Sequence, residues 1–479
     1  MDSNLNNNQG SHHCLTHKKQ RRMWSFFLLL GLLCSSCHGS VTCKNDTNHE
    51  VDWYILYKVP RMDSLSGDSL KEQRNVCRLM DSNLNNNNQG SEHWLTLPFQ
   101  RRMWTFFLLL GLLCSSCHGS VTCKNDKNVE VDWYILYKAP RMDSLSGPLS
   151  GSDIDSNGKK QFNNINSPLG VLGQTLRPLF RPIRNMEESF GFISYSDQPP
   201  GSNADYKRFG HSKGVLMADR TGTGLWLSHS TPQFPFRRDQ NHFWPQSGNK
   251  NAQTFICVTF NYNQFREIGR HLQNIRAFPF EHYVPENFHQ ELQQVVKWTE
   301  EAPSIINVGH VASLTSRGNK AFKSFAKPTS EEEDEGDLYV SIASGIMSDV
   351  YVQTWGCQRG RSDSYCPTKG YKVTNVEDVT VEATAGAHIL TWKPKVDHSK
   401  WCVAVDQNTH WTCIADMNRA VSQYQRHGGA LCIHDENVHS QFLRFAKHPN
   451  TCRKRPPPSW SSDCDSEDSG GRISSSSMG

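Results

Sequence analysis

Segments rich in Val, Ile, Phe, Tyr and Trp recur along the chain, and such runs are typical of β-strands. Residues 255–260 are apolar almost throughout, which predicts a buried strand. Leu216 and residues 224–227 flank a turn that carries Asp219 and Gly222, so this stretch predicts a hairpin. Further strands are predicted at residues 131–137, 190–195, 351–355, 379–383 and 388–392.

Apolar residues recur at helical spacing in residues 265–275 and 292–296, which predicts two helices whose apolar stripes belong to the core. Residues 143–168 are rich in Ser, Gly, Asn and Asp and predict a loop. The acidic run at residues 331–335 predicts a solvated loop that would repel phosphates. Strands that alternate with helices indicate an α/β fold class.

The first 147 residues contain a leader that occurs twice. Residues 1–67 and 80–147 are near copies, and residues 23–42 differ from residues 103–122 only by Ser25 against Thr105. Each copy has two arginines, a short apolar run and a small-residue end, the order of a secretory signal peptide. Neither run approaches the roughly 20 residues of a membrane span. We therefore expect two export signals, of which only one can be used.

A tandem fold unit would need three or more repeats, so a duplicated exon or a gene-prediction error explains the near identity better. Initiation at Met103 would still retain the apolar run and the cleavage region. We expect the working protein to begin near Val121 and residues 1–79 to contribute nothing to function. The copied strand at residues 51–57 would compete with residues 131–137 for one place in the sheet. The sequence does not decide whether residues 1–102 are translated.

The remaining chain predicts two halves and a tail. We place a signal-peptide region at residues 80–120, the halves at 121–304 and 305–455, and a disordered Ser-rich tail at 456–479. A content of 36% apolar and 20% charged residues is ordinary for a globular protein. The net charge of +4 does not indicate a general polyanion binder. Attraction for a polyanion would have to be local, or arise when the 21 histidines protonate.

Sixteen cysteines in a chain with a signal peptide indicate an oxidising compartment. Nine remain from Val121 onward, so one thiol must stay unpaired. No C-x-x-C pair occurs in this body, which argues against a zinc site. The one N-x-S/T sequon, at Asn45, lies in the first leader copy.

Two short segments carry the chemistry. His398 and Lys400 lie two residues apart, as do His211 and Lys213, so in extended backbone each pair projects from one face. A neutral imidazole and an ammonium together supply a nucleophile or proton donor and fixed positive charge for a phosphodiester, without a metal. A single pair would more often be a chance occurrence on a solvated strand.

Each pair is followed by a second distinctive segment at similar distance. His229 lies eighteen residues after His211, within WLSHSTPQFP, and Asn418 lies twenty residues after His398, within DMNR. This spacing fits a strand, a turn and a returning strand that brings a polar side chain back beside the pair. The chain therefore predicts two half-sites.

These strings, together with GHSKG and HSKW, resemble deoxyribonuclease II, the lysosomal acid endonuclease family within the phospholipase D superfamily. The resemblance extends from about Val121 to Cys452. It implies an α/β, phospholipase D-like fold with two pseudo-symmetric αβ halves, each a mixed sheet flanked by helices, meeting at one active-site cleft.

The resemblance also implies the reaction. One of His211 and His398 attacks phosphorus to give a phosphohistidine, and the other protonates the leaving 5′ oxygen. Lys213 and Lys400 hold the phosphate oxygens, and His229 and Asn418, in matching places, orient the phosphate or the imidazoles. The implied substrate is double-stranded DNA, cut to 3′-phosphate and 5′-hydroxyl ends without metal or cofactor. The implied location is the lysosome, reached by the secretory pathway, with secretion as the other destination; homodimer formation stays open.

Disulfides are implied in the same way. Cys123 would pair with Cys257, Cys413 with Cys432, and Cys452 with either Cys357 or Cys366.

The chain departs from the superfamily pattern at one point. The Asp expected five residues after each Lys is Ala218 in one segment and Val405 in the other, with Asp219 and Asp406 one position later. A one-residue slip turns a strand side chain to the opposite face, so neither Asp is assigned a catalytic role. Trp401 belongs either to the core or to a base-stacking surface.

Two other functions stay open at this level. The half-sites would also suit a phospholipase D-like enzyme acting on a lipid phosphodiester. A secreted DNA-binding or inactive protein of the same family is the non-enzyme alternative. Parallel assays on plasmid DNA and phosphatidylcholine would separate them.

Overall fold

The structure of the protein is a computed structural model. It describes residues 53–58, 120–141, 151–155, 158–162, 165–297 without 203, 206 and 239–241, and 309–452 without 383–388, 448, 450 and 451. The predicted signal sequences and the predicted tail lie outside these residues. Within the described part of the chain, every helix is too short or too polar to cross a bilayer.

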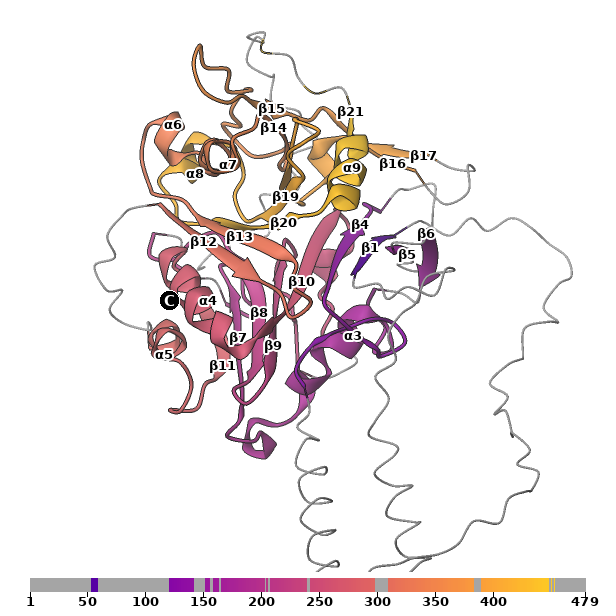
Figure 1. The fold of residues 1–479 in the computed structure, drawn as a ribbon, viewed down its shortest axis with the longest axis vertical. Coiled ribbons are helices and arrows are strands. Elements are labelled where there is room, and N and C mark those ends of the chain that lie inside the picture. Colours follow the sequence, from indigo (N-terminus) through magenta and orange to yellow (C-terminus); the bar gives the residue numbers. More distant parts are fainter. Residues whose placement is uncertain are drawn as a thin grey trace, which may run out of the picture. The chain divides into compact units, whose positions relative to one another are not determined.

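The larger sheet has nine strands in the order β11-β7-β8-β9-β10-β4-β1-β5-β6 (Figure 1). Its strands are β1 (Trp53–Lys58), β4 (Trp133–Lys138), β5 (Gly151–Asp155), β6 (Gly158–Phe162), β7 (Phe190–Ser196), β8 (Lys213–Asp219), β9 (Thr223–His229), β10 (Gln253–Asn261) and β11 (Pro279–Tyr283). The β8–β9 hairpin and the buried strand β10 confirm the sequence predictions for these stretches.

The smaller sheet has seven strands in the order β12-β13-β20-β19-β18-β14-β15. They are β12 (His310–Thr315), β13 (Ala321–Ala326), β14 (Val350–Gln353), β15 (Val373–Asn375), β18 (Trp401–Ala404), β19 (Trp411–Ala415) and β20 (Gly429–His434). Two minor sheets join β17-β16-β21 and β2-β3. Their strands are β2 (Cys123–Lys124), β3 (Glu130–Val131), β16 (Asp378–Glu382), β17 (Ile389–Trp392) and β21 (Ala446–Lys447).

Helices flank both sheets. The predicted helices are present as α4 (Phe265–Asn274) and α5 (Gln290–Val296), and the others are α3 (Val171–Leu176), α6 (Glu333–Gly336), α7 (Leu338–Ile346), α8 (Val421–Tyr424) and α9 (Glu436–Phe445). Short 3₁₀ helices connect the elements at Arg177–Phe180, Ile183–Asn185, Gln246–Gly248, Tyr262–Gln264 and Pro394–Val396.

The same arrangement occurs in both sheets. Strands β7-β8-β9-β10-β4 of the larger sheet and β14-β18-β19-β20-β13 of the smaller sheet are neighbours in the same order, and every neighbouring pair is antiparallel. A helix precedes the first strand in each case, α3 or α7, and a helix follows the fourth, α4 or α9.

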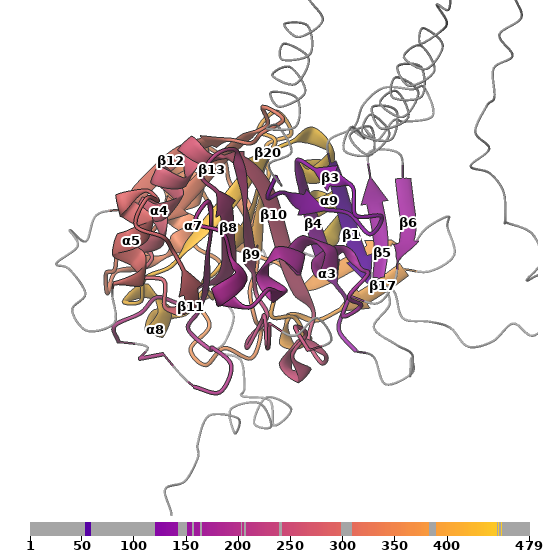
Figure 2. The ribbon, with the colours of Figure 1, turned by 90° about the horizontal axis from the view of Figure 1, so that it is seen from below.

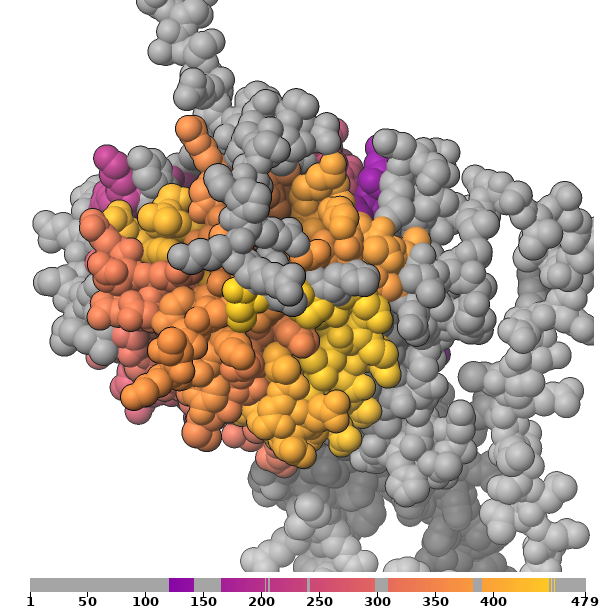
Figure 3. Space-filling view, turned by 90° about the horizontal axis from the view of Figure 1, so that it is seen from above, coloured from indigo at the N-terminus to yellow at the C-terminus, as the bar shows by residue number. Residues whose placement is uncertain are grey.

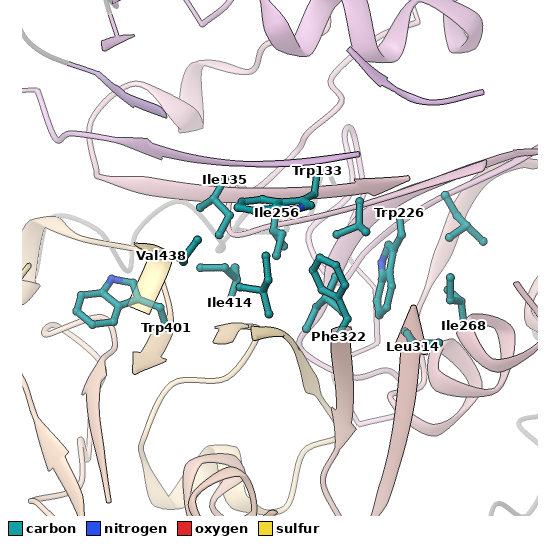
Figure 4. Packing of buried hydrophobic residues seen from close by; sticks show 14 of the residues in the cluster. Trp133, Ile135, Trp226, Ile256, Ile268, Leu314, Phe322, Trp401, Ile414 and Val438 are labelled. Carbon is teal, nitrogen blue, oxygen red and sulfur yellow. The ribbon is translucent and has the colours of Figure 1, made fainter. Parts of the chain in front are cut away.

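One apolar core is shared by the two sheets. Trp133 and Ile256 of the larger sheet face Phe322 and Ile414 of the smaller sheet (Figure 4). The apolar faces of α4 and α9 enter the same core, and the N-terminus of α9 is capped by Asp435, which accepts from the Asn437 and Val438 amides. Because apolar surface removed from water stabilises by about 25 cal/mol per Å², this contact is the main force holding the sheets together.

Each sheet is also buried on its other face. Along β10, Phe255 and Cys257 pack beneath α3, whereas Ile256 and Val258 point into the shared core. Figure 2 shows α3 across the larger sheet. Helix α7 covers the smaller sheet in the same way. Figure 3 shows the face opposite to the one seen in Figure 2. Residues of the C-terminal part, in orange and yellow, make up most of its coloured surface.

Three sequence predictions are wrong in detail. The strand β1 does not compete with β4, because it lies beside it, parallel, with Trp53 opposite Trp133. The predicted loop at 143–168 contains the antiparallel strands β5 and β6. The acidic run is not wholly a solvated loop. Its residues 333–336 form α6, and Glu333 forms an ion pair of 3.1 Å with the fully buried Arg419.

Disulfides pair Cys123 with Cys257 and Cys413 with Cys432, as expected. Of the two partners considered for Cys452, the structure selects Cys366. Cys357 is disulfide-bonded as well. Within the described residues the unpaired thiol is Cys402, which is buried in β18.

A buried histidine on α4 makes the stability of the fold depend on pH. His271 packs on Trp226 with ring centroids 5.1 Å apart, and burial lowers its pKa to about 3. The folded pKa is below the unfolded value of 6.5, so this contribution to stability is complete above pH 6.5 and is lost as the pH falls toward 3.

We predict that replacing His271 by Phe flattens the decline of stability in acid. Between pH 7 and pH 5, wild type should lose about 2 kcal/mol more unfolding free energy than the variant, because only wild type must keep an imidazole neutral at position 271. Urea unfolding at both pH values measures the difference. Equal losses in the two proteins would contradict the assignment.

Candidate active site

The two His-x-Lys segments occupy equivalent positions in the two sheets. Lys213 is the first residue of β8, and His211 lies two positions before it. Lys400 directly precedes β18, and His398 lies two positions before Lys400. Both strands are the second in the shared strand order and lie next to the hairpin partner, β9 or β19. The predicted strand, turn and returning strand are therefore present in both segments.

His211 is held by backbone from the smaller sheet. Its amide donates to the His427 carbonyl at 2.9 Å, and the Gly210 amide donates to the Arg276 carbonyl at 2.9 Å. The chains approach so closely that a Cβ on Gly210 would lie 2.0 Å from the Ile275 carbonyl oxygen. A glycine is thus required immediately before the histidine.

Charged side chains surround the His211 ring. The Asp197 carboxylate, at the end of β7, lies 3.8 Å from Nε2 of His211 and 2.5 Å from Nζ of Lys213. Arg426, which precedes β20, lies 3.1 Å from Oδ2 of Asp197, the oxygen that also faces His211. Among the described residues, Nδ1 of His211 is buried and has no hydrogen-bond partner.

These contacts shift the pKa of both acidic and basic groups. Burial alone would raise the pKa of Asp197, but Lys213, His211 and Arg426 outweigh it and hold that pKa well below its usual range. Burial lowers the pKa of His211 well below 6.5. Asp197 opposes this shift, while Lys213, Arg426 and Lys400 add to it.

His398 is held from the larger sheet. Its amide donates to the Ala252 carbonyl at 3.0 Å, and its Nε2 lies 3.1 Å from the Asn251 amide nitrogen. The Trp355 indole and the imidazole pack edge to face, with ring centroids 4.7 Å apart. Lys400 turns back to donate to the His398 carbonyl at 2.7 Å.

A buried hydrogen-bond network fixes the backbone before His398. Asp397 accepts from the Tyr137 hydroxyl at 2.5 Å, from the Trp392 indole at 2.7 Å and from the Ser399 amide at 2.8 Å. Trp401 is fully buried and also donates to Tyr137, so it is a core residue and not a base-stacking one.

The two pairs share one electrostatic environment. Burial and, next, the nearby Lys213 ammonium of the other segment together lower the pKa of Lys400 to about 7, against the influence of Asp197, Asp397 and Asp416. The structure therefore brings His211, Lys213, His398 and Lys400 into one region. Burial raises the pKa of Asp416 to about 8 against the influence of both lysines.

His229 and Asn418 do not occupy matching places, which corrects the sequence prediction. The residue after each lysine pairs with the returning strand: Gly214 with Ser228, and Trp401 with Ile414. The next residue is His229 in the first sheet and Ala415 in the second, so His229 corresponds to Ala415. The gaps of eighteen and twenty residues differ because Asn418 lies three positions beyond the end of β19.

The surroundings of these two residues differ as well. His229 is buried between Phe234 and Phe255, and burial together with Lys213 lowers its pKa to about 3. Asn418 accepts from the Trp355 amide at 3.3 Å and donates to Gln358 at 2.9 Å. It thus holds the loop that places the Trp355 indole against His398.

Asp219 and Asp406, to which the sequence analysis assigned no catalytic role, accept hydrogen bonds within turns. Asp219 accepts from the Thr221 amide at 2.8 Å and Asp406 from the Asn408 amide at 2.9 Å. Across the described residues there is no cluster of three or more His, Cys, Asp or Glu arranged to bind a metal ion.

Comparison with known proteins agrees with the geometry. A family model described as Deoxyribonuclease II matches residues 122–452. The chain belongs to the deoxyribonuclease II family. Deoxyribonuclease-2-alpha of Sus scrofa is 34% identical over 363 residues, covering 72% of this chain and 95% of that protein. Deoxyribonuclease-2-beta of Mus musculus is 31% identical over 357 residues, covering 73% and 96%, and Plancitoxin-1 of Acanthaster planci is 31% identical over 379 residues, covering 74% and 100%.

Among solved structures, a yeast tyrosyl-DNA phosphodiesterase gives a TM-score of 0.23 at 9% identity, over 47% of this chain and 66% of that one. This likeness is too weak to assign a fold.

Several groups at the site of this deoxyribonuclease II family member were not predicted from sequence. Asp197, Arg426, Asn251 and Trp355 all contact the four predicted residues or each other, yet none belongs to the recognised strings. Asp197 lies two positions after the predicted strand at residues 190–195, and a charged residue so close to a strand end was the available signal.

We predict that Gly210→Ala lowers the DNA-cleaving rate of this deoxyribonuclease II family member by about tenfold or more. The added methyl must push His211 away from the Ile275 and His427 carbonyls, and small displacements at a reacting group are costly. Gly222→Ala is the matched control, because a Cβ there meets nothing within 4 Å. Initial rates of plasmid nicking measure both. Equal loss in both variants would show that the site geometry is not the cause.

Proposed function

We propose that this protein is an acid endodeoxyribonuclease that hydrolyses DNA phosphodiester bonds at a site built from His211, Lys213, His398 and Lys400. The observation that carries the proposal is that both His-x-Lys segments begin equivalent strands, and that backbone from the opposite sheet holds each histidine. Family membership supports DNA as the substrate.

The repeated strand order supports two equivalent αβ halves, residues 121–304 and 305–455, in a phospholipase D-like fold. In this interpretation the shared core is the interface of the halves and the reaction takes place where β8 and β18 begin. Each half then supplies one imidazole and one ammonium to a single phosphate.

The chemistry proceeds in two steps. A ring nitrogen of one histidine attacks phosphorus, the bond from phosphorus to the 5′ oxygen breaks, and the other histidine gives that oxygen its proton. Water then attacks the phosphohistidine, losing its proton to the second histidine, and the phosphorus–nitrogen bond breaks. The products carry 3′-phosphate and 5′-hydroxyl ends, and both imidazoles return to their starting states.

The lysines stabilise the charge that develops on the non-bridging oxygens. Acid pH suits this pair because the reaction needs one neutral and one protonated imidazole, and such coupled groups titrate together. No metal ion is needed in this scheme. The disulfides are consistent with passage through the secretory pathway, and we place the enzyme in lysosomes.

We predict that the purified protein nicks supercoiled plasmid near pH 5 in the presence of a chelator. His398→Ala and Lys400→Ala should each reduce the rate by at least about a hundredfold, since they remove a reacting group and a phosphate contact. His434→Ala, an exposed residue at the opposite end of β20, should not change the rate.

Phosphatidylcholine vesicles form the parallel arm of this test. Hydrolysis of the lipid in preference to DNA would favour a lipid phosphodiesterase. DNA binding without cleavage by wild type would favour a non-enzymatic protein.

We also predict the chemistry of the cut ends. Fragments should accept a radiolabelled phosphate from polynucleotide kinase without prior dephosphorylation, because attack on phosphorus with loss of the 5′ oxygen leaves a free 5′-hydroxyl. Fragments that become labelled only after phosphatase treatment would contradict the proposed direction of bond cleavage.

A further inference from the structure

Asp197 is a buried carboxylate to which the chemistry above assigns no role. Its side chain is 4% exposed. Its carboxylate oxygens lie close to three basic groups, Lys213 at 2.5 Å, Arg426 at 3.1 Å and His211 at 3.8 Å. Its amide donates to the Ser212 carbonyl at 3.1 Å, between the histidine and the lysine. Backbone and side chain of one residue therefore hold both members of the pair.

The equivalent position in the other sheet holds an indole. Tyr195 pairs with Gly214 and Gln353 pairs with Trp401, so Asp197 and Trp355, each two residues further on, correspond. Trp355 lies against His398 as Asp197 lies against His211. The two half-sites therefore resemble each other in backbone but differ in the charge beside the imidazole.

We propose, on the basis of the function proposed above, that Asp197 is the positioning residue of the first half-site, holding the Lys213 ammonium and the His211 ring together with help from Arg426. In the superfamily pattern an Asp on the strand itself would follow the lysine, and here that position is Ala218. Asp197 approaches from the neighbouring strand β7 instead.

Charge balance supports this role. Lys213, Arg426 and Lys400 all act on His211. The other carboxylate near both lysines, Asp416, has a pKa raised by burial to about 8, so it is largely uncharged in acid and leaves Asp197 as the compensating anion. Buried cations that repel one another need a compensating anion to stay in place. Without Asp197, the ammonium of Lys213 would move toward solvent and the imidazole would face three positive groups.

We predict that Asp197→Asn retains DNA binding but lowers kcat by about tenfold or more, because the amide keeps the shape of the carboxylate and loses its charge. The pKa of His211 should also be lower in the variant than in wild type. Imidazole NMR signals measure this directly, with His211→Gln used to assign the signal. KM should change by less than about threefold.

Asp435→Asn is the matched control. Asp435 is also a buried carboxylate paired with a lysine, Lys320 at 2.7 Å, and it lies at the far end of β20. This control should lose stability through its helix cap but keep kcat and the titration of His211. Unchanged kcat and unchanged His211 titration in folded Asp197→Asn would overturn the proposal.

A second variant covers the case in which Asp197→Asn does not fold. Arg426→Gln leaves the pair of Asp197 and Lys213 intact but frees one carboxylate oxygen, and should lower kcat by about threefold or more with little change in KM. Unchanged kcat in this variant would overturn the role assigned to Arg426, and with it the proposal that Asp197 and Arg426 together hold Lys213 and His211.

The titration separates this inference from the proposed function. If wild type does not cleave DNA, the nuclease function fails, yet the shift of His211 in Asp197→Asn still reports whether Asp197 acts on that ring. If wild type cleaves and the shift is absent, the positioning role alone fails.

Discussion

The apolar core shared by the two sheets is the constraint on which the rest of the structure depends. His211 and His398 lie at the starts of strands in different sheets, and neither sheet contains a complete site. Burying Trp133, Ile256 and Ile414 between the sheets fixes their spacing. A change in that spacing would separate the histidines before it altered either strand.

Hydrogen bonds across the sheets then set the position of each histidine. The His211 amide binds a carbonyl next to β20, and the His398 amide binds a carbonyl next to β10. Reciprocal bonds of this kind join the two half-sites through rigid backbone rather than through mobile side chains. The buried network of Asp397 and Tyr137 ties the second segment to β4 in the same way.

Electrostatics limits how such a site can be built. Two lysines and an arginine act on one buried imidazole, and the ionised carboxylate of Asp197, whose pKa they hold well below its usual range, offsets their mutual repulsion. The burial that strengthens the interactions of these charges also makes each charge costly unless it is paired. The asymmetry between Asp197 and Trp355 shows that the halves share a backbone plan without sharing their charges.

The sequence by itself determined the family and the four His-x-Lys residues through short strings, and the β8–β9 hairpin and the helix α4 through local patterns. Two disulfides followed from the family resemblance. Only the tertiary structure decided that Asp197 and Arg426 lie beside His211 and Lys213 and that His229 and Asn418 are not equivalent. Arg426 lies 229 positions from Asp197, so no local pattern connects them. The position of Asn418 depends on where β19 ends, and strand ends are set by packing and not by residue counts.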